Sequence, residues 1–137
     1  MPCLSGRYHP GIGPIVNVGV AKPGTLTPTA AAPAVAVPAL LDTGATSTCI
    51  ALSVANVVGP SPIGMRPMVS ATHSIPVNVY LADLVMPFGA SGFAVSGSQL
   101  MEFTPHPAAP FQILVGRDII CQGLLTISFD GHFTFCL

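Results

Sequence analysis

The sequence predicts one mainly β domain, residues 1–137, with one short helix near its C-terminus. Glycine and proline are abundant, at 14 and 15 of 137 residues, and both residue types disfavour long helices. The apolar runs are short, rich in β-branched residues and bounded by turn residues, which is typical of strands. A chain of this length can bury one hydrophobic core.

The expected elements follow one another with short connections. Residues 15–20 and 34–41 are apolar runs on either side of a loop rich in Pro, Thr and Ala at 22–32, so we expect two strands joined by a wide loop. For residues 45–57 the pattern leaves two alternatives, a short strand or a single helical turn. Further strands are expected at 93–95, 100–103 and 111–115.

A long hairpin is expected at residues 64–84, with the small polar tip Ser70–Ser74 between two extended arms. In its second arm Val77, Val79 and Leu81 alternate with polar or aromatic residues, as side chains on one face of a strand do. Met65, Met68, Val69 and Ile75 on the two arms are candidates to line a binding pocket, although ordinary hairpin packing also explains them.

The C-terminal region predicts a helix and a second hairpin. Residues 117–122 fit one short helix that Gly123 ends. Residues 124–129 and 132–137 are apolar runs separated by Asp130-Gly131, and Asp-Gly between two such runs is a strong hairpin signal.

Charge and composition exclude several classes of function. Four Lys and Arg nearly balance five Asp and Glu, for a net charge of −1, so we expect no nucleic-acid partner and no membrane-binding basic patch. The N-terminus lacks the apolar segment of a secretory signal. Four cysteines and four histidines are scattered without metal-ligand spacing. We therefore expect no metal or cofactor, reduced and mostly buried thiols, and a cytoplasmic protein.

The residues with the clearest chemical meaning are Asp42-Thr43-Gly44, which directly follow the apolar run 34–41. An acid at the end of a strand that turns sharply through glycine is held in a fixed place, as catalysis requires. The tripeptide alone is weak evidence. Its structural alternative is a simple turn in which the aspartate accepts a hydrogen bond from the backbone two residues on.

A second motif lies about seventy residues downstream, at Ile113-Leu-Val-Gly-Arg-Asp-Ile-Ile120. A strand ending in Asp-Thr-Gly-Ala, a hairpin, and then Leu-Val-Gly-Arg-Asp-Ile-Ile occur here in the order found in the retropepsin family. From about Ile15 to the C-terminus the chain resembles that family, and the final strand with its hairpin resembles its soluble, prokaryotic-type members. The resemblance implies a closed β-barrel of the acid-protease fold and a homodimer.

The resemblance also implies roles for particular residues. Asp42 is expected as the catalytic carboxylate, Thr43 as a hydrogen-bonding link to the partner's loop, and Gly44 as room for the substrate backbone. Viral members often carry an acidic residue where this chain has Thr46, so Arg117 is expected to lack that partner. The remaining expected positions are Ala45 at the cleft edge, the flap tip Ser70, Ala71, Thr72, His73 and Ser74 over the substrate, and structural support from Gly116, Arg117 and Asp118.

Aspartic-protease chemistry needs two carboxylates that share one proton and titrate as a pair. The chain contains one Asp-Thr-Gly, so the second carboxylate must be Asp42 of another copy. The function predicted from the sequence is an aspartic endopeptidase that cleaves extended, mainly apolar polypeptide segments. The alternative is a catalytically weak or inactive dimeric module of the same fold that binds peptides by strand addition.

Overall fold

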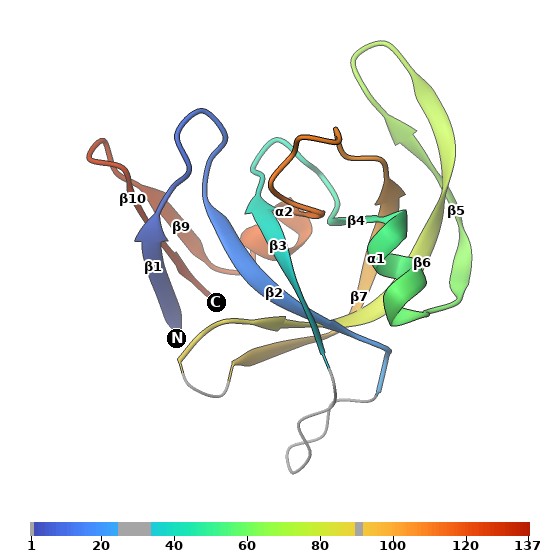
Figure 1. Cartoon of the computed structure of the whole chain (residues 1–137), viewed down its shortest axis with the longest axis horizontal. Coiled ribbons are helices and arrows are strands. Elements are labelled where there is room, and N and C mark those ends of the chain that lie inside the picture. Colours follow the sequence, from blue (N-terminus) through green and yellow to red (C-terminus); the bar gives the residue numbers. More distant parts are fainter. Residues whose placement is uncertain (1, 25–33, 90–91) are drawn as a thin grey trace.

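The computed structural model describes residues 2–24, 34–89 and 92–137. The described chain forms two sheets and two helices (Figure 1). The elements are β1 (Cys3–Arg7), β2 (Ile15–Ala21), β3 (Val35–Leu41), β4 (Cys49–Ala51), α1 (Leu52–Val58), β5 (Pro62–Val69), β6 (Ser74–Met86), β7 (Phe93–Phe103), β8 (Ile113–Val115), α2 (Arg117–Ile120), β9 (Leu124–Ile127) and β10 (His132–Cys136).

Six strands close into a barrel in the order β2-β3-β8-β4-β7-β6, and β6 pairs with β2 to complete the ring. The β3–β8 and β4–β7 pairs are parallel, whereas the others are antiparallel. Inward side chains such as Val18, Val20, Ile50, Leu84 and Leu100 are fully buried at 0 % exposure. The fold is therefore the mainly β, closed barrel that the sequence predicts.

The strand β5 lies outside the ring and pairs only with β6, so the two form a hairpin that extends beyond the barrel (Figure 1). Residues 62–76 of this hairpin, here called the flap, are all exposed except Met68, which is partly buried. Further along β6, Val79, Tyr80 and Ala82 are buried in the barrel wall. The hairpin thus has a buried base and an exposed outer half.

A second, three-stranded sheet has the order β1-β10-β9 and brings the two ends of the chain together. Cys3 lies opposite Cys136 in the β1–β10 register, and the two form a disulfide. The expectation of four reduced thiols is wrong for these two, because only the fold reveals a pairing across 133 residues. Disulfides are typical of oxidising compartments, so the cytoplasmic prediction loses the support of reduced thiols.

The structure differs from the sequence prediction in three further places. The segment 45–57, predicted as a strand or a helical turn, has both: β4, and the helix α1, which runs to Val58 and which Gly59 ends with a left-handed φ of 80°. The helix α1 comes in addition to the predicted α2. The runs at 93–95 and 100–103 belong to one strand, β7, because Gly97 donates a backbone hydrogen bond to the buried Asp83 carboxylate and β7 continues past it. The strand β1 was not predicted.

The predicted loop at 22–32 lies largely outside the described residues. Neither of the described helices is long and apolar enough to cross a membrane.

Candidate active site

The Asp42 loop, residues 42–48, begins where β3 ends beside β8. Leu41 lies opposite Val115 in the parallel pairing of these strands. The backbone N–H of Asp42 then donates to the carbonyl of Val115 at 2.9 Å. The position of Asp42 is thus fixed by the barrel wall from which its loop emerges.

The half-buried carboxylate of Asp42 is oriented by its own loop. The carboxylate Oδ1 accepts a hydrogen bond from the Gly44 backbone N–H at 2.9 Å, and the backbone carbonyl of Asp42 accepts one from the Ala45 N–H at 3.2 Å. A Cβ at position 44 would lie 3.2 Å from the same Oδ1, so glycine keeps the carboxylate uncrowded. This bond belongs to the simple turn as well as to a catalytic loop, and does not distinguish the two by itself.

Arg117 ties the start of α2 to the Asp42 loop. Its Nη1 donates to the carbonyl of Thr43 and its Nη2 to the Thr46 hydroxyl, both at 3.0 Å. Its backbone N–H donates to the Ala45 carbonyl at 2.8 Å. Arg117 lacks an acidic partner at position 46, but its side chain is anchored nevertheless, because the Thr46 hydroxyl accepts a hydrogen bond from it.

Asp118 and Thr48 form a second tie beneath the loop. Asp118 accepts from the Thr48 backbone N–H at 3.0 Å and from its hydroxyl at 2.7 Å, while the same hydroxyl accepts from the Gly116 N–H at 3.1 Å. Thr48 is fully buried, so it would be costly to leave these groups unpaired. A Cβ on Gly116 would lie 2.6 Å from the backbone of Ser47, so only glycine permits this approach.

A cleft of about 430 Å³ separates the Asp42 loop from the flap. Residues 44–47 line one side and residues 67–69 the other. Its remaining walls are mainly apolar and come from Cys49, Met101, Phe103 and Leu114. The cleft joins the loop that carries Asp42 to the underside of the flap, where an extended chain could lie.

Cys49 is a buried thiol in the wall of this cleft. Burial, together with the negative charges of Asp118 and Asp42, raises the pKa of the thiol to about 11. A thiol in this environment is protonated near neutral pH and is a poor nucleophile. Cys49 is therefore a wall residue rather than an alternative catalytic group.

The flap tip is held by bonds within itself. The Ser70 N–H donates to the His73 carbonyl at 2.8 Å, and the Ser70 hydroxyl accepts from the His73 N–H at 3.0 Å. The hydroxyl of Thr72 lies 2.7 Å from His73 Nδ1. All five predicted tip residues, Ser70 to Ser74, are exposed.

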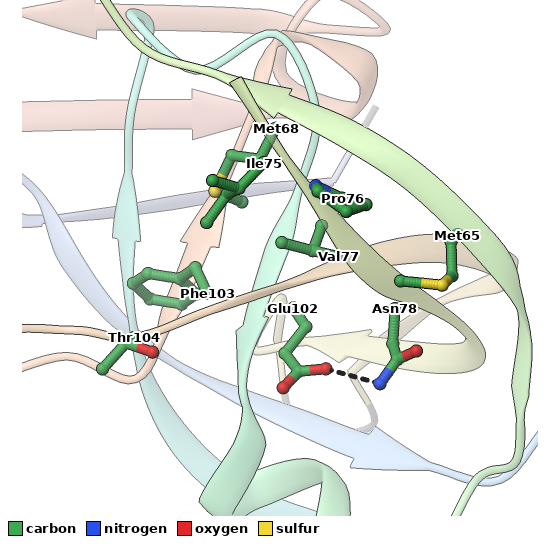
Figure 2. Close-up of a pocket in the computed structure, with 9 residues that line it drawn as sticks. All are labelled: Met65, Met68, Ile75, Pro76, Val77, Asn78, Glu102, Phe103 and Thr104. Carbon is green, nitrogen blue, oxygen red and sulfur yellow. Dashed lines mark hydrogen bonds between the residues drawn. The ribbon is translucent and has the colours of Figure 1, made fainter. Parts of the chain in front are cut away.

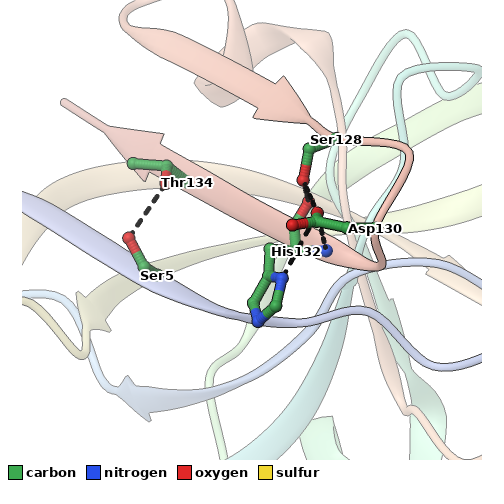
Figure 3. Close-up of polar contacts among 5 residues, drawn as sticks. All are labelled: Ser5, Ser128, Asp130, His132 and Thr134. Atoms are coloured by element: carbon green, nitrogen blue, oxygen red, sulfur yellow. Dashed lines mark hydrogen bonds and ion pairs between the residues drawn. The ribbon is translucent and has the colours of Figure 1, made fainter.

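A Ser–Asp–His cluster at the β9–β10 turn is not a second catalytic centre (Figure 3). The Ser128 hydroxyl donates to Asp130, and His132 Nδ1 lies 3.3 Å from the same carboxylate. In a serine-hydrolase triad the histidine stands between serine and aspartate, whereas here the aspartate does. All three residues are exposed, and the bonds stabilise the turn.

No family model and no curated protein matches the sequence. The fold is similar to that of a solved structure, the crystal structure of a retropepsin-like aspartic protease from Rickettsia conorii, with a TM-score of 0.65. The match covers 97 % of this chain and 89 % of that chain, at 11 % sequence identity. The chain has a retropepsin-like fold. At this identity the likeness establishes the fold alone.

Within the retropepsin-like fold, the sequence-predicted residues divide into two groups. Gly116, Arg117 and Asp118 all contact or bond to the Asp42 loop, and Gly44 and Ala45 line the cleft beside Asp42. The tip residues Ser70 to Ser74 do not line it, whereas Met68 and Val69 on the flap arm do. Sequence reasoning missed Thr48, because its partner Asp118 lies 70 residues away along the chain.

Proposed function

We propose that the protein is an aspartic endopeptidase whose catalytic pair consists of Asp42 from each of two identical subunits. The observation that carries this proposal is an oriented aspartate on a loop tied down at Thr43, Thr46 and Thr48, next to a cleft that a hairpin covers. Rigid support and a covered cleft are what a hydrolytic site needs to position a water molecule and a peptide.

The second carboxylate comes from another copy, because the other described acidic residues of this chain form contacts elsewhere and none is paired with Asp42. Asp118 bonds to Thr48, and Asp83 accepts from the backbone of Gly24 and Gly97. Asp130 lies in the β9–β10 turn, and Glu102 bonds to Asn78. A two-fold axis through the Asp42 loop supplies an identical partner.

Two features support dimer formation near this loop. Among the described residues, none bonds to the Thr43 hydroxyl, so it is free to bond to a partner's loop. The edge strand β9 follows α2 closely and exposes Leu124 and Ile127, both at 56 %, with Phe129 fully exposed just beyond it. An unpaired, apolar strand edge is a ready surface for pairing with a second copy.

The chemistry follows from two carboxylates held close together. Like charges at short distance cannot both ionise easily, so the pair shares one proton. The ionised Asp42 removes a proton from the attacking water while the protonated Asp42 of the second subunit donates to the carbonyl oxygen of the scissile amide. This requirement for one proton in the pair favours activity at mildly acidic pH.

The substrate is an extended polypeptide that lies between the flap and the Asp42 loop. The mainly apolar cleft walls, Met68, Met101, Phe103 and Leu114, favour apolar side chains next to the scissile bond. The β5 and β6 arms present a strand pair along which an extended peptide can be held through its backbone.

The test is cleavage of a diverse peptide library from pH 4 to 8 by the wild-type protein and by Asp42→Asn. The proposal expects cleavage by the wild type only, with the mutant folded and dimeric by analytical sedimentation. Residual cleavage by Asp42→Asn at the same sites would overturn the mechanism. No cleavage by either protein, both folded and dimeric, would favour the peptide-binding module instead.

A further inference from the structure

A second pocket of about 540 Å³ lies between the flap arms and the end of β7 (Figure 2). It shares Met68 and Phe103 with the cleft beside the Asp42 loop, so the two hollows adjoin at these side chains. A peptide that extends from the cleft past these two residues reaches this pocket with a side chain further from the scissile bond.

The walls of the second pocket are mainly apolar. Met65, Met68, Ile75, Val77 and Phe103 supply carbon and sulfur surface. The carboxylate of Glu102 and the amide of Asn78 stand together in one wall (Figure 2). Apolar walls with a few convergent polar groups are the usual composition of a site that selects a ligand.

Among the described residues, hydrogen bonds reach one oxygen of the Glu102 carboxylate. Its Oε2 accepts from Asn78 Nδ2 at 2.9 Å and from the Tyr80 hydroxyl at 3.3 Å. These two donors hold the carboxylate in one orientation. In the described part of the chain nothing bonds to its Oε1, and no basic side chain forms an ion pair with it.

The negative charge of Glu102 is felt by its neighbour. Burial, and after it the charge on Glu102, raises the pKa of the Tyr80 hydroxyl above its ordinary value. A half-buried carboxylate beside apolar side chains carries a desolvation cost that a cation would offset. The pocket therefore combines negative charge with apolar walls.

We propose that Glu102 determines specificity at a subsite of the cleft by binding the lysine or arginine side chain of a peptide substrate. This inference rests on the proposed function and refines the expectation of mainly apolar substrates, which the cleft next to Asp42 retains. The aliphatic stem of the basic residue packs on Met68, Ile75 and Val77, and its charged group reaches Glu102 Oε1. Lysine and arginine both have such an apolar stem and a charged end.

The probe is a positional-scanning library of decapeptides in which each position in turn carries Lys, Arg, norleucine or Glu. Binding is measured with the catalytically disabled Asp42→Asn protein, and cleavage with the protein that retains Asp42. Each is compared with a second protein that also carries Glu102→Gln. Glutamine keeps an oxygen that can accept from Asn78 and Tyr80, so this change removes charge with little change in shape. The matched control is Asp130→Asn, which removes an exposed carboxylate from the β9–β10 turn.

The proposal expects one peptide position at which Lys or Arg is preferred over norleucine by about tenfold or more, as a charge-assisted hydrogen bond predicts. Glu102→Gln abolishes that preference, so that Lys, Arg and norleucine peptides bind about equally well, while Asp130→Asn keeps the preference. Thermal unfolding of Glu102→Gln checks that the fold is retained. Absence of a basic preference at every position, or a preference that survives Glu102→Gln, would overturn the proposal.

The binding measurement separates this inference from the proposed function. A Glu102-dependent basic preference in binding, with no cleavage by the wild type, would contradict the endopeptidase and leave the subsite intact. Cleavage that depends on Asp42 but is indifferent to basic residues would contradict the subsite and leave the endopeptidase intact.

Discussion

The Asp42 loop and the flap face each other across the cleft, yet among the described residues only the loop forms hydrogen bonds with residues far from it in the sequence. Arg117 and Asp118 bond to the loop across 70 or more positions, and Thr48 beneath it is fully buried. The flap tip bonds only within residues 70–73, and its arms are exposed. Elements with few buried contacts open at low free-energy cost.

This difference separates a well-supported region, the Asp42 loop, from a weakly attached one, the flap. The group proposed for chemistry stands on a rigid base, because a small displacement of a catalytic group lowers the rate strongly. In the proposed function the flap has to move for a polypeptide to enter the cleft, and its few buried contacts would allow this motion. Substitutions at Thr48 and Gly116, beneath the Asp42 loop, should therefore lower the free energy of unfolding far more than matched substitutions in the flap.

The largest difference in stability is expected between the variants Gly116→Ala and Gly64→Ala. A Cβ at position 116 would lie 2.6 Å from the Ser47 carbonyl carbon, which is backbone and cannot move freely, whereas a Cβ at position 64 meets nothing within 4 Å. Gly116→Ala should lower the free energy of unfolding by about 3 kcal/mol, and Gly64→Ala should change it by less than about 0.5 kcal/mol. Urea unfolding of both proteins measures this, and equal losses would break the comparison.

A smaller contrast is expected between Thr48→Val and Thr72→Val. Valine at 48 leaves the buried Gly116 N–H without its acceptor and removes the Thr48 hydroxyl from Asp118 Oδ1, which keeps only the Ile119 N–H as donor. This loss should cost about 2 kcal/mol. The Thr72 hydroxyl contacts His73 at an exposed tip, so its loss should cost less than about 0.5 kcal/mol. Denaturant midpoints in the reverse order would show that the flap, and not the loop base, is the rigid partner.

The smallest effect concerns reactivity rather than stability. Burial raises the pKa of the Cys49 thiol to about 11. Between pH 7 and 9.5 the fraction of Cys49 present as thiolate should therefore rise about tenfold per pH unit and stay small. Its alkylation by iodoacetamide, followed by mass spectrometry, should be much slower than that of the exposed Cys121. Asp42→Asn removes one nearby negative charge and should speed the reaction. A rate that levels off below pH 9 would contradict this account of the cleft wall.

Local patterns in the sequence predict much of this structure. The run before Asp42, the alternation in residues 77–81 and the Asp130-Gly131 turn each give the correct element, because strand period and turn chemistry depend on near neighbours. The paired Asp-Thr-Gly and Gly-Arg-Asp segments also indicate which loop is supported by α2.

Contacts between distant residues could not be predicted in this way. The Thr48–Asp118 tie and the Cys3–Cys136 disulfide join positions 70 and 133 residues apart, and no local pattern specifies such partners. The sequence predicts that Gly97 interrupts the strand, but β7 continues through it because the Asp83 carboxylate accepts a hydrogen bond from the Gly97 N–H. The proposed role of Glu102 has no signature in the sequence, because it depends on the apolar side chains that surround this residue in the fold.

The central claim, one active site from two Asp42 residues, is tested most directly by mixing subunits. Wild-type protein and an equal amount of Asp42→Asn are unfolded together and refolded, so that dimers form at random, and peptide cleavage is compared with wild type refolded alone. If both copies supply the catalytic pair, activity per wild-type subunit falls to about one half, because mixed dimers are inactive. Activity per wild-type subunit that stays unchanged on mixing would mean that each chain acts alone, and would contradict the shared site.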